Sequence, residues 1–216
     1  ALTGPRKKLP LAGALALVLG VVSTAFAITT APTMTSAEQV VANGAGTGTN
    51  GQQEVVTQPK TTASETPQEN GITAGTISIY GDSVTLASAQ ALQEKLPQAS
   101  IDAAVSRTLV AELPALKEHA EAKKIGQIVV ISLSTNSSIT TDQVDELQQI
   151  LSPNKERKVV LVTGAAPANL TWVDQSNYML KHAAEQRKDT FILADWAQKT
   201  QGHPEYLVSD GVHPQG

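Results

Sequence analysis

Three residues of this chain have the side-chain types and the placement that nucleophilic catalysis requires. Ser83 follows Gly81 and Asp82 at the end of a β-branched run, while Asp210 and His213 lie three residues apart near the C-terminus. A carboxylate that holds one ring nitrogen of a histidine fixes its tautomer, and the other nitrogen can then take a proton from a hydroxyl. In a lone Gly-Asp-Ser the serine more often serves only as a helix N-cap, which is the alternative role for Ser83. Taken together, the three residues predict a triad with Ser83 as nucleophile, His213 as base and Asp210 as the residue that orients His213.

Polar groups that follow two further β-branched runs are candidates for an oxyanion hole. Asn136 could direct its side-chain amide at the oxygen of a tetrahedral intermediate. The backbone N–H of Ser106 could complete the hole, together with that of Ser83 at the start of the next helix.

Two other residues are weaker candidates for substrate binding. Arg107 either clamps an acidic group of the substrate or pairs with a surface carboxylate, and His203 is a candidate for lining the acceptor cleft. The chain contains no cysteine, and its histidines and carboxylates show no metal-ligand spacing. We therefore expect neither a metal nor another cofactor.

The elements that must position these residues alternate in type. Short β-branched runs separated by amphipathic segments are typical of a parallel sheet covered by helices, and ligands bind such sheets at the carboxyl ends of the strands. The pattern predicts a three-layer α/β/α, flavodoxin-like fold with a five-stranded parallel sheet. The expected strands are 76–80, 100–105, 127–133, 158–163 and 190–195, and the expected helices are 86–96, 109–124, 141–151 and 172–188.

The N-terminal third of the chain has a different composition. Residues 9–32 carry no charge, and this segment is long enough for a helix that crosses about 30 Å of hydrocarbon. The basic flank 1–8 predicts a cytoplasmic N-terminus. A cleaved signal peptide is the alternative, since Ala25-Phe26-Ala27 fits a cleavage site. Residues 33–73 are rich in Thr, Gly, Gln and Ser and predict a disordered extracellular linker before the globular domain 74–216.

The overall composition excludes some partners. The chain of 216 residues has a net charge of −4 and contains only two Trp, three Tyr and two Phe. An acidic protein with few aromatic residues does not suit nucleic-acid binding. The absence of cysteine is compatible with an exported bacterial protein.

Four short motifs of the globular part resemble, in order and spacing, the conserved blocks of SGNH hydrolases. More narrowly, residues 74–216 look like the extracellular C-terminal SGNH domain of bacterial acyltransferase-3/SGNH peptidoglycan O-acetyltransferases, in which a last membrane helix and a linker precede this domain. The motifs are Gly81-Asp82-Ser83, Ser106-Arg107, Ser134-Thr135-Asn136 and Asp210-Gly211-Val212-His213, and Asp195-Trp196 also resembles a pair found after the last strand.

The resemblance implies a serine-triad O-acetyltransferase of the bacterial cell membrane with its catalytic domain outside. Ser83 would form an acetyl-enzyme, and the acceptor would be a sugar of peptidoglycan or another cell-wall polysaccharide, in this family the C6 hydroxyl of N-acetylmuramic acid. A membrane acyltransferase domain would deliver the acetyl donor. It also implies a C-terminal helix beyond His213, which this chain lacks.

Two departures from the family pattern qualify the resemblance. Ser106 and Ser134 stand where the family usually has Gly. A serine keeps the backbone N–H, but it is costly where φ is positive.

Two other functions are open on the sequence. A carbohydrate acetylesterase would use the same fold and triad to remove acetyl groups. A non-catalytic envelope-binding domain would keep the triad only as a relic.

Overall fold

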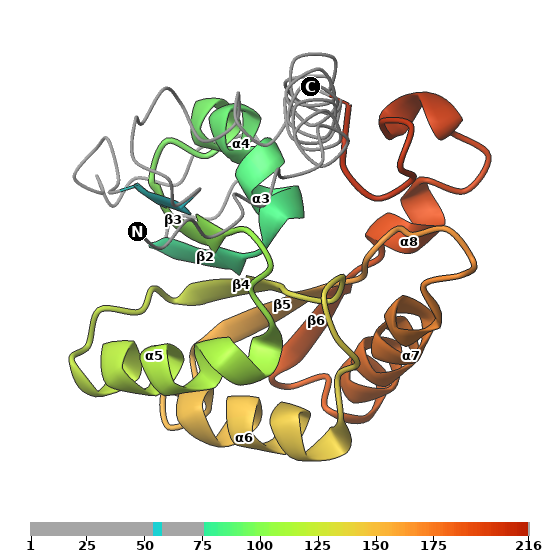
Figure 1. The fold of residues 1–216 in the computed structure, drawn as a ribbon. Coiled ribbons are helices and arrows are strands. Elements are labelled where there is room, and N and C mark those ends of the chain that lie inside the picture. The colour runs from blue at the N-terminus through green and yellow to red at the C-terminus, as the bar shows by residue number, and fades with distance from the viewer. Residues whose placement is uncertain (1–53, 58–75, 216) are drawn as a thin grey trace, which may run out of the picture. The chain divides into compact units, whose positions relative to one another are not determined.

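The structure, a computed structural model, describes residues 54–57 and 76–215, which include a six-stranded sheet (Figure 1). Five strands are parallel and follow the order β3-β2-β4-β5-β6. The predicted five-stranded parallel sheet is therefore confirmed, and each predicted strand end lies within one residue of the observed one. The strands are β2 Ile77–Gly81, β3 Ala99–Ala104, β4 Ile128–Ser132, β5 Lys158–Val162 and β6 Phe191–Ala194.

A sixth strand, β1, was not expected from the sequence. It spans Glu54–Thr57 and pairs antiparallel with β3 at the edge of the sheet. These four residues lie inside the segment 33–73 that the composition assigns to a linker. Only Val55, Val56 and Thr57 carry β-branched side chains there, and a run so short does not stand out from its polar surroundings.

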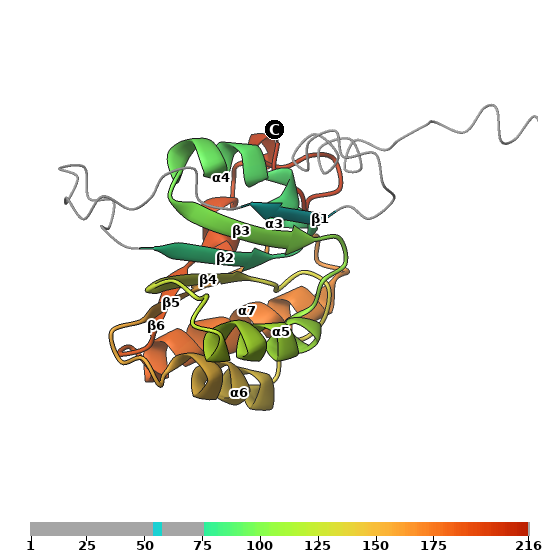
Figure 2. The ribbon, with the colours of Figure 1, turned by 90° about the vertical axis from the view of Figure 1, so that its left-hand side faces the viewer.

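Helices cover both faces of the sheet, and Figure 2 shows α3 and α4 on one side and α5, α6 and α7 on the other. Three predicted helices are confirmed: 141–151 has the ends that were predicted, and the other two differ slightly at their ends. The predicted helix 86–96 is instead two helices, and the first begins at Ser83. The helices are α3 Ser83–Ala87, α4 Ala89–Lys95, α5 Leu109–Glu121, α6 Thr141–Leu151, α7 Thr171–Gln186 and α8 Trp196–Lys199, with a 3₁₀ turn at Pro204–Tyr206.

Side-chain caps explain where α3, α5 and α6 begin. The carboxylate of Asp82 accepts from the N–H of Val84 and caps α3. Thr108 caps α5 in the same way, and Thr140 forms a capping box with Gln143 at the start of α6. Each cap supplies an acceptor for N–H groups that the first helical turn leaves without a partner.

The core has two parts, one on each face of the sheet. Alternate side chains of β4, β5 and β6 pack with leucines of α5, α6 and α7, whereas β2 and β3 pack with α3 and α4 on the opposite face. Such alternation holds the strands at a fixed register, because a slip by one residue would exchange the two faces. The carboxyl ends of β2 and β4 are thereby fixed side by side.

The membrane prediction concerns residues that the structure does not describe. Among residues 54–57 and 76–215, no helix has the length and apolarity needed to cross a membrane. The predicted span 9–32, its basic flank 1–8 and most of the linker lie outside the described residues.

Replacement of a core leucine should destabilise the domain far more than replacement of an exposed neighbour on the same helix. Leu113 of α5 is 2% exposed and Val110 is 53% exposed. Leu113→Ala should lower the free energy of unfolding by about 2–5 kcal/mol because it leaves a cavity. Val110→Ala should change it by less than about 0.5 kcal/mol. Urea unfolding followed by circular dichroism measures both, and equal losses would show that α5 does not pack as described.

Candidate active site

Ser83 is held at the carboxyl end of β2 by the turn into α3. It is the first residue of α3, its N-cap is Asp82, and its side chain is 8% exposed. Gly81 allows this turn because a Cβ there would lie 2.1 Å from Oγ1 of Thr85. Ser83 is therefore held, nearly buried, at the start of α3.

The segment 207–214, here called the C-terminal arm, brings His213 and Asp210 to Ser83. Nε2 of His213 lies 2.9 Å from Oγ of Ser83, and Nδ1 lies 2.7 Å from Oδ2 of Asp210. The structure thus joins the three residues of the predicted triad in one hydrogen-bonded chain.

The arm has a compact turn that fixes this geometry. Oδ1 of Asp210 accepts from the N–H groups of Val212 at 2.8 Å and His213 at 3.0 Å. Gly211 has a φ of 70°, a conformation that favours glycine. The two ends of the arm are tied together where the N–H of Val208 donates to the carbonyl of His213 at 2.9 Å. The carboxylate therefore holds both the backbone and the ring of His213.

Contacts within the arm lower the pKa of Asp210. Partial burial raises the pKa, but the N–H of Val212, the ring and N–H of His213 and the charge of His213 outweigh it and hold the pKa below its usual value. Asp210 is therefore ionised near neutral pH and can stabilise a protonated His213.

Of the three expected oxyanion donors, the side-chain amide of Asn136 already has hydrogen-bond acceptors in the described structure. Nδ2 of Asn136 donates to the carbonyl oxygen of Arg107 at 3.2 Å and to Oδ2 of Asp82 at 3.3 Å. Ser106 has a φ of 60°, so it occupies the left-handed region that glycine tolerates best. Ser134 is the second position at which this chain has serine where the family pattern has glycine. It is accommodated because it is buried and its hydroxyl donates to the carbonyl of Val162 at 3.3 Å.

Arg107 and His203 are placed differently from each other. The guanidinium of Arg107 lies 2.6 Å from Oδ1 of Asp102 and 3.2 Å from Oε2 of Glu112, which matches the ion-pair alternative. His203 is exposed, pairs with Glu205 and stacks on Tyr206 at a centroid distance of 4.7 Å. A substrate contact for either residue stays a prediction.

Asp82 and Thr135 were not singled out in the sequence, although the structure places both in the site. Asp82 is fully buried, and its Oδ2 accepts from Oγ1 of Thr135 at 2.5 Å. Burial raises the pKa of Asp82, against the hydrogen bonds from Thr135 and Val84 and the charge of His213. The sequence suggests Ser83 as a helix cap, whereas the structure has Asp82 in that role. Nothing in the sequence shows that the second oxygen of Asp82 meets the loop after β4.

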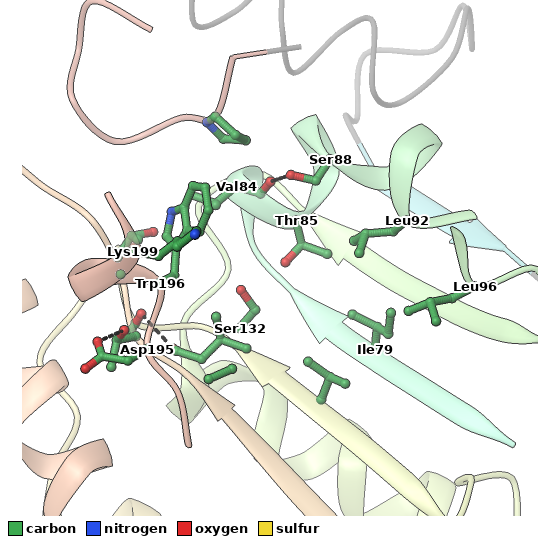
Figure 3. Close-up of a pocket in the computed structure, with 18 residues that line it drawn as sticks. Ile79, Val84, Thr85, Ser88, Leu92, Leu96, Ser132, Asp195, Trp196 and Lys199 are labelled. Carbon is green, nitrogen blue, oxygen red and sulfur yellow. Dashed lines mark hydrogen bonds between the residues drawn. The ribbon is translucent and has the colours of Figure 1, made fainter. Parts of the chain in front are cut away.

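A cavity of about 460 Å³ adjoins this site on the face of the sheet that carries α3 and α4. Figure 3 shows Ile79, Leu92 and Leu96 on one side of it and Trp196 and Lys199 on the other. Val84 and Pro214, the neighbours of Ser83 and His213, also line it. The wall is mainly apolar, with Asp195 and Lys199 as its charged residues.

Metal ligands do not gather in the described part of the chain. No group of three or more His, Asp or Glu side chains there is close enough to hold an ion.

Comparisons with known proteins identify O-acetyltransferases among the relatives. No protein-family model matches the chain. The chain is 35% identical over 136 residues to the O-acetyltransferase OatA of Staphylococcus aureus (strain NCTC 8325), and the match covers 62% of this chain but only 22% of that protein. A putative O-acetyltransferase of S. aureus strain COL matches with the same identity and coverage.

Two solved structures share the fold. The C-terminal catalytic domain of the peptidoglycan O-acetyltransferase A (OatA) of Streptococcus pneumoniae, with a methylsulfonyl adduct, superposes with a TM-score of 0.59 and 28% identity, over 65% of this chain and 80% of that one. A GDSL-like lipase of Bacteroides thetaiotaomicron superposes with a TM-score of 0.50 and 18% identity over the same shares. The second match shows the fold alone.

Because φ of Ser106 is positive, replacement by glycine and replacement by valine should affect the free energy of unfolding differently. Ser106→Gly should leave the free energy of unfolding unchanged or raise it by up to about 1 kcal/mol, because glycine has no Cβ to strain. Ser106→Val should lower it by about 1–3 kcal/mol, because a β-branched side chain fits poorly at positive φ. Thermal unfolding of the two variants tests this difference. Similar stabilities would mean that Ser106 does not hold the left-handed conformation.

Asp210 should contribute to stability only above acidic pH. Its pKa is lowered in the folded state, so its contribution is present above the unfolded pKa of about 3.9 and is lost as the pH falls through the folded pKa. Asp210→Asn should therefore be less stable than the parent chain at pH 7, with a difference that shrinks below about pH 4. Unfolding curves at pH 3 to 7 measure it, and a constant difference would contradict the lowered pKa.

Proposed function

Since this chain resembles the C-terminal catalytic domain of OatA-type peptidoglycan O-acetyltransferases in sequence and fold, we propose that it is an O-acetyltransferase of the bacterial cell envelope. It uses Ser83, His213 and Asp210 as a triad. The observation that carries this proposal is the hydrogen-bonded chain from Ser83 Oγ through the ring of His213 to Asp210.

In the first half-reaction, Oγ of Ser83 attacks the carbonyl carbon of an acetyl ester and passes its proton to Nε2 of His213. The negative charge that develops on the carbonyl oxygen is stabilised by the N–H groups of Ser83 and Ser106 and by the amide of Asn136. The ester bond then breaks, and the leaving oxygen takes the proton from His213. An acetyl group remains on Ser83, and Asp210 stabilises the imidazolium while it exists.

In the second half-reaction, a sugar hydroxyl takes the place of the leaving group. Nε2 of His213 accepts its proton, and its oxygen attacks the acetyl carbonyl. The bond to Ser83 then breaks, and Oγ of Ser83 recovers the proton. The acceptor is a cell-wall polysaccharide, and the C6 hydroxyl of N-acetylmuramic acid in peptidoglycan is the acceptor we propose.

The layout of the chain supports a location outside the membrane. In this proposal residues 9–32 anchor the chain, with 1–8 in the cytoplasm. The segment 33–73 leads from the anchor to the catalytic domain 74–216 and contributes the edge strand β1 to its sheet. A membrane acyltransferase domain supplies the acetyl donor on the outer face.

The triad should account for nearly all turnover of the 216-residue chain on an activated acetyl ester. Ser83→Ala or His213→Ala should each lower kcat by at least about a thousandfold, because nucleophile and base act as a unit. Ser209→Ala and His182→Ala are matched controls with exposed side chains, and both should keep the parent rate. The rate at which a chromogenic acetyl ester releases its coloured leaving group measures all four variants. Full activity in Ser83→Ala would overturn the triad.

The acceptor distinguishes a transferase from an esterase. Muramic-acid oligosaccharides added with the acetyl donor should gain acetyl groups detectable by mass spectrometry, because a bound hydroxyl placed near the attack geometry outcompetes water. Release of acetate alone would assign the chain to the carbohydrate esterases. No Ser83-dependent turnover with any acetyl donor would leave the non-catalytic binding domain.

A further inference from the structure

Asp82 connects the nucleophile turn to the oxyanion side of the site. Its Oδ1 accepts from the N–H of Val84 at 2.9 Å, and its Oδ2 accepts from Thr135 at 2.5 Å and from Nδ2 of Asn136 at 3.3 Å. Its own N–H donates to the carbonyl of Ser132 at 3.2 Å. One buried side chain thus ties the start of α3 to the loop that follows β4.

A helix cap alone does not account for a carboxylate at this position. Ser, Thr or Asn caps a helix as well as Asp does, without the cost of burying an ionisable group. Asp82 is fully buried, and burial raises its pKa. The second oxygen, which takes no part in the cap, is the part of the side chain that calls for another explanation.

The amide group of Asn136 has two hydrogens, and three acceptors lie within hydrogen-bond distance of its Nδ2. The two shorter contacts are to the carbonyl oxygen of Arg107 at 3.2 Å and to Oδ2 of Asp82 at 3.3 Å, and the third is to Oγ1 of Thr135 at 3.4 Å. Asn136 is otherwise exposed, so its side chain would rotate freely without these contacts. The carbonyl of Arg107 belongs to the turn that also presents the N–H of Ser106.

We propose that Asp82 is a positioning residue, whose Oδ2 keeps one amide hydrogen of Asn136 while the other turns from the carbonyl of Arg107 to the oxygen of the acyl group. This inference rests on the proposed function, and it assigns Asp82 no contact with the substrate. In the free enzyme, the carbonyl of Arg107 accepts the hydrogen bond that the acyl oxygen accepts during the reaction. The hydrogen bond from Asn136 to Asp82 persists throughout.

The isosteric change Asp82→Asn tests this role directly. An asparagine oxygen can still cap Val84, but its NH₂ group then faces Nδ2 of Asn136, so that a donor meets a donor. If the amide is reversed, the same conflict arises at Val84. The substitution therefore preserves the shape of the side chain and replaces one of its two acceptor oxygens with a donor.

The first measurement is a double-mutant cycle on the 216-residue chain. Asp82→Asn should lower kcat at least about tenfold and change KM less than about twofold, since it affects a donor used in the transition state. In an Asn136→Ala background the same substitution should change kcat less than about twofold, because the two residues act as one unit. Equal losses in both backgrounds, or no loss in the parent chain, would overturn the proposal.

The matched control is Thr140→Ala, which removes the N-cap of α6 at the same edge of the sheet. It should lower the unfolding temperature and leave kcat within about twofold of the parent value. If Thr140→Ala lowered kcat as much as Asp82→Asn, loss of a helix cap would explain both results and the positioning role would be wrong.

The second measurement does not depend on turnover, so it separates this inference from the proposed function. The two side-chain amide proton signals of Asn136, assigned by their loss in Asn136→Ala, should shift in Asp82→Asn and stay in place in Thr140→Ala. Unchanged Asn136 signals in Asp82→Asn would overturn the positioning role, whatever the activity. A chain without Ser83-dependent turnover but with the expected shifts would refute the proposed function and retain the contact.

Discussion

The hydrogen bond between Ser83 and His213 joins residues 130 positions apart, and the rest of the described structure serves to make it possible. The central strand β2 fixes Ser83 at its carboxyl end, flanked by β3 and β4. His213 comes from an arm that follows β6 and α8, and its backbone is closed by the bonds of Val208 and Asp210. A contact of 2.9 Å tolerates little error at either end. The parallel sheet supplies the rigidity on the first side, and the turn at Gly211 supplies it on the second.

Two carboxylates lie on either side of Ser83, and their environments move their pKa values in opposite directions. Asp210 is partly exposed and surrounded by donors that favour its ionised form, which suits a residue that stabilises a protonated imidazole. Asp82 is fully buried, and burial raises its pKa despite its hydrogen bonds. Such a division is a common way to give two similar groups different tasks. Here one carboxylate serves the base, and we assign the other to the oxyanion side.

The parallel sheet could be predicted because each strand leaves a short local pattern, and the structure brings Ser83, His213 and Asp210 within hydrogen-bond distance of one another. Each β-branched run became a strand, and the residues directly after β2, β3 and β4 met at one edge as strand polarity requires. The strand β1 could not be predicted, since four residues without a pattern of their own pair only because β3 offers an open edge. The break between α3 and α4 was also missed. The second role of Asp82 depends on burial and on a partner 54 positions away, and neither leaves a local signal.

The central claim is that Ser83 carries the acetyl group between donor and acceptor. The most direct measurement is acid quenching of the 216-residue chain during turnover of an acetyl ester, followed by peptide mass spectrometry. The account predicts one acetyl group on the peptide that contains Ser83, its loss when an acceptor sugar is added, and no such adduct in Ser83→Ala. Transfer of acetyl groups to the sugar without an adduct on Ser83, or with equal efficiency in Ser83→Ala, would contradict it.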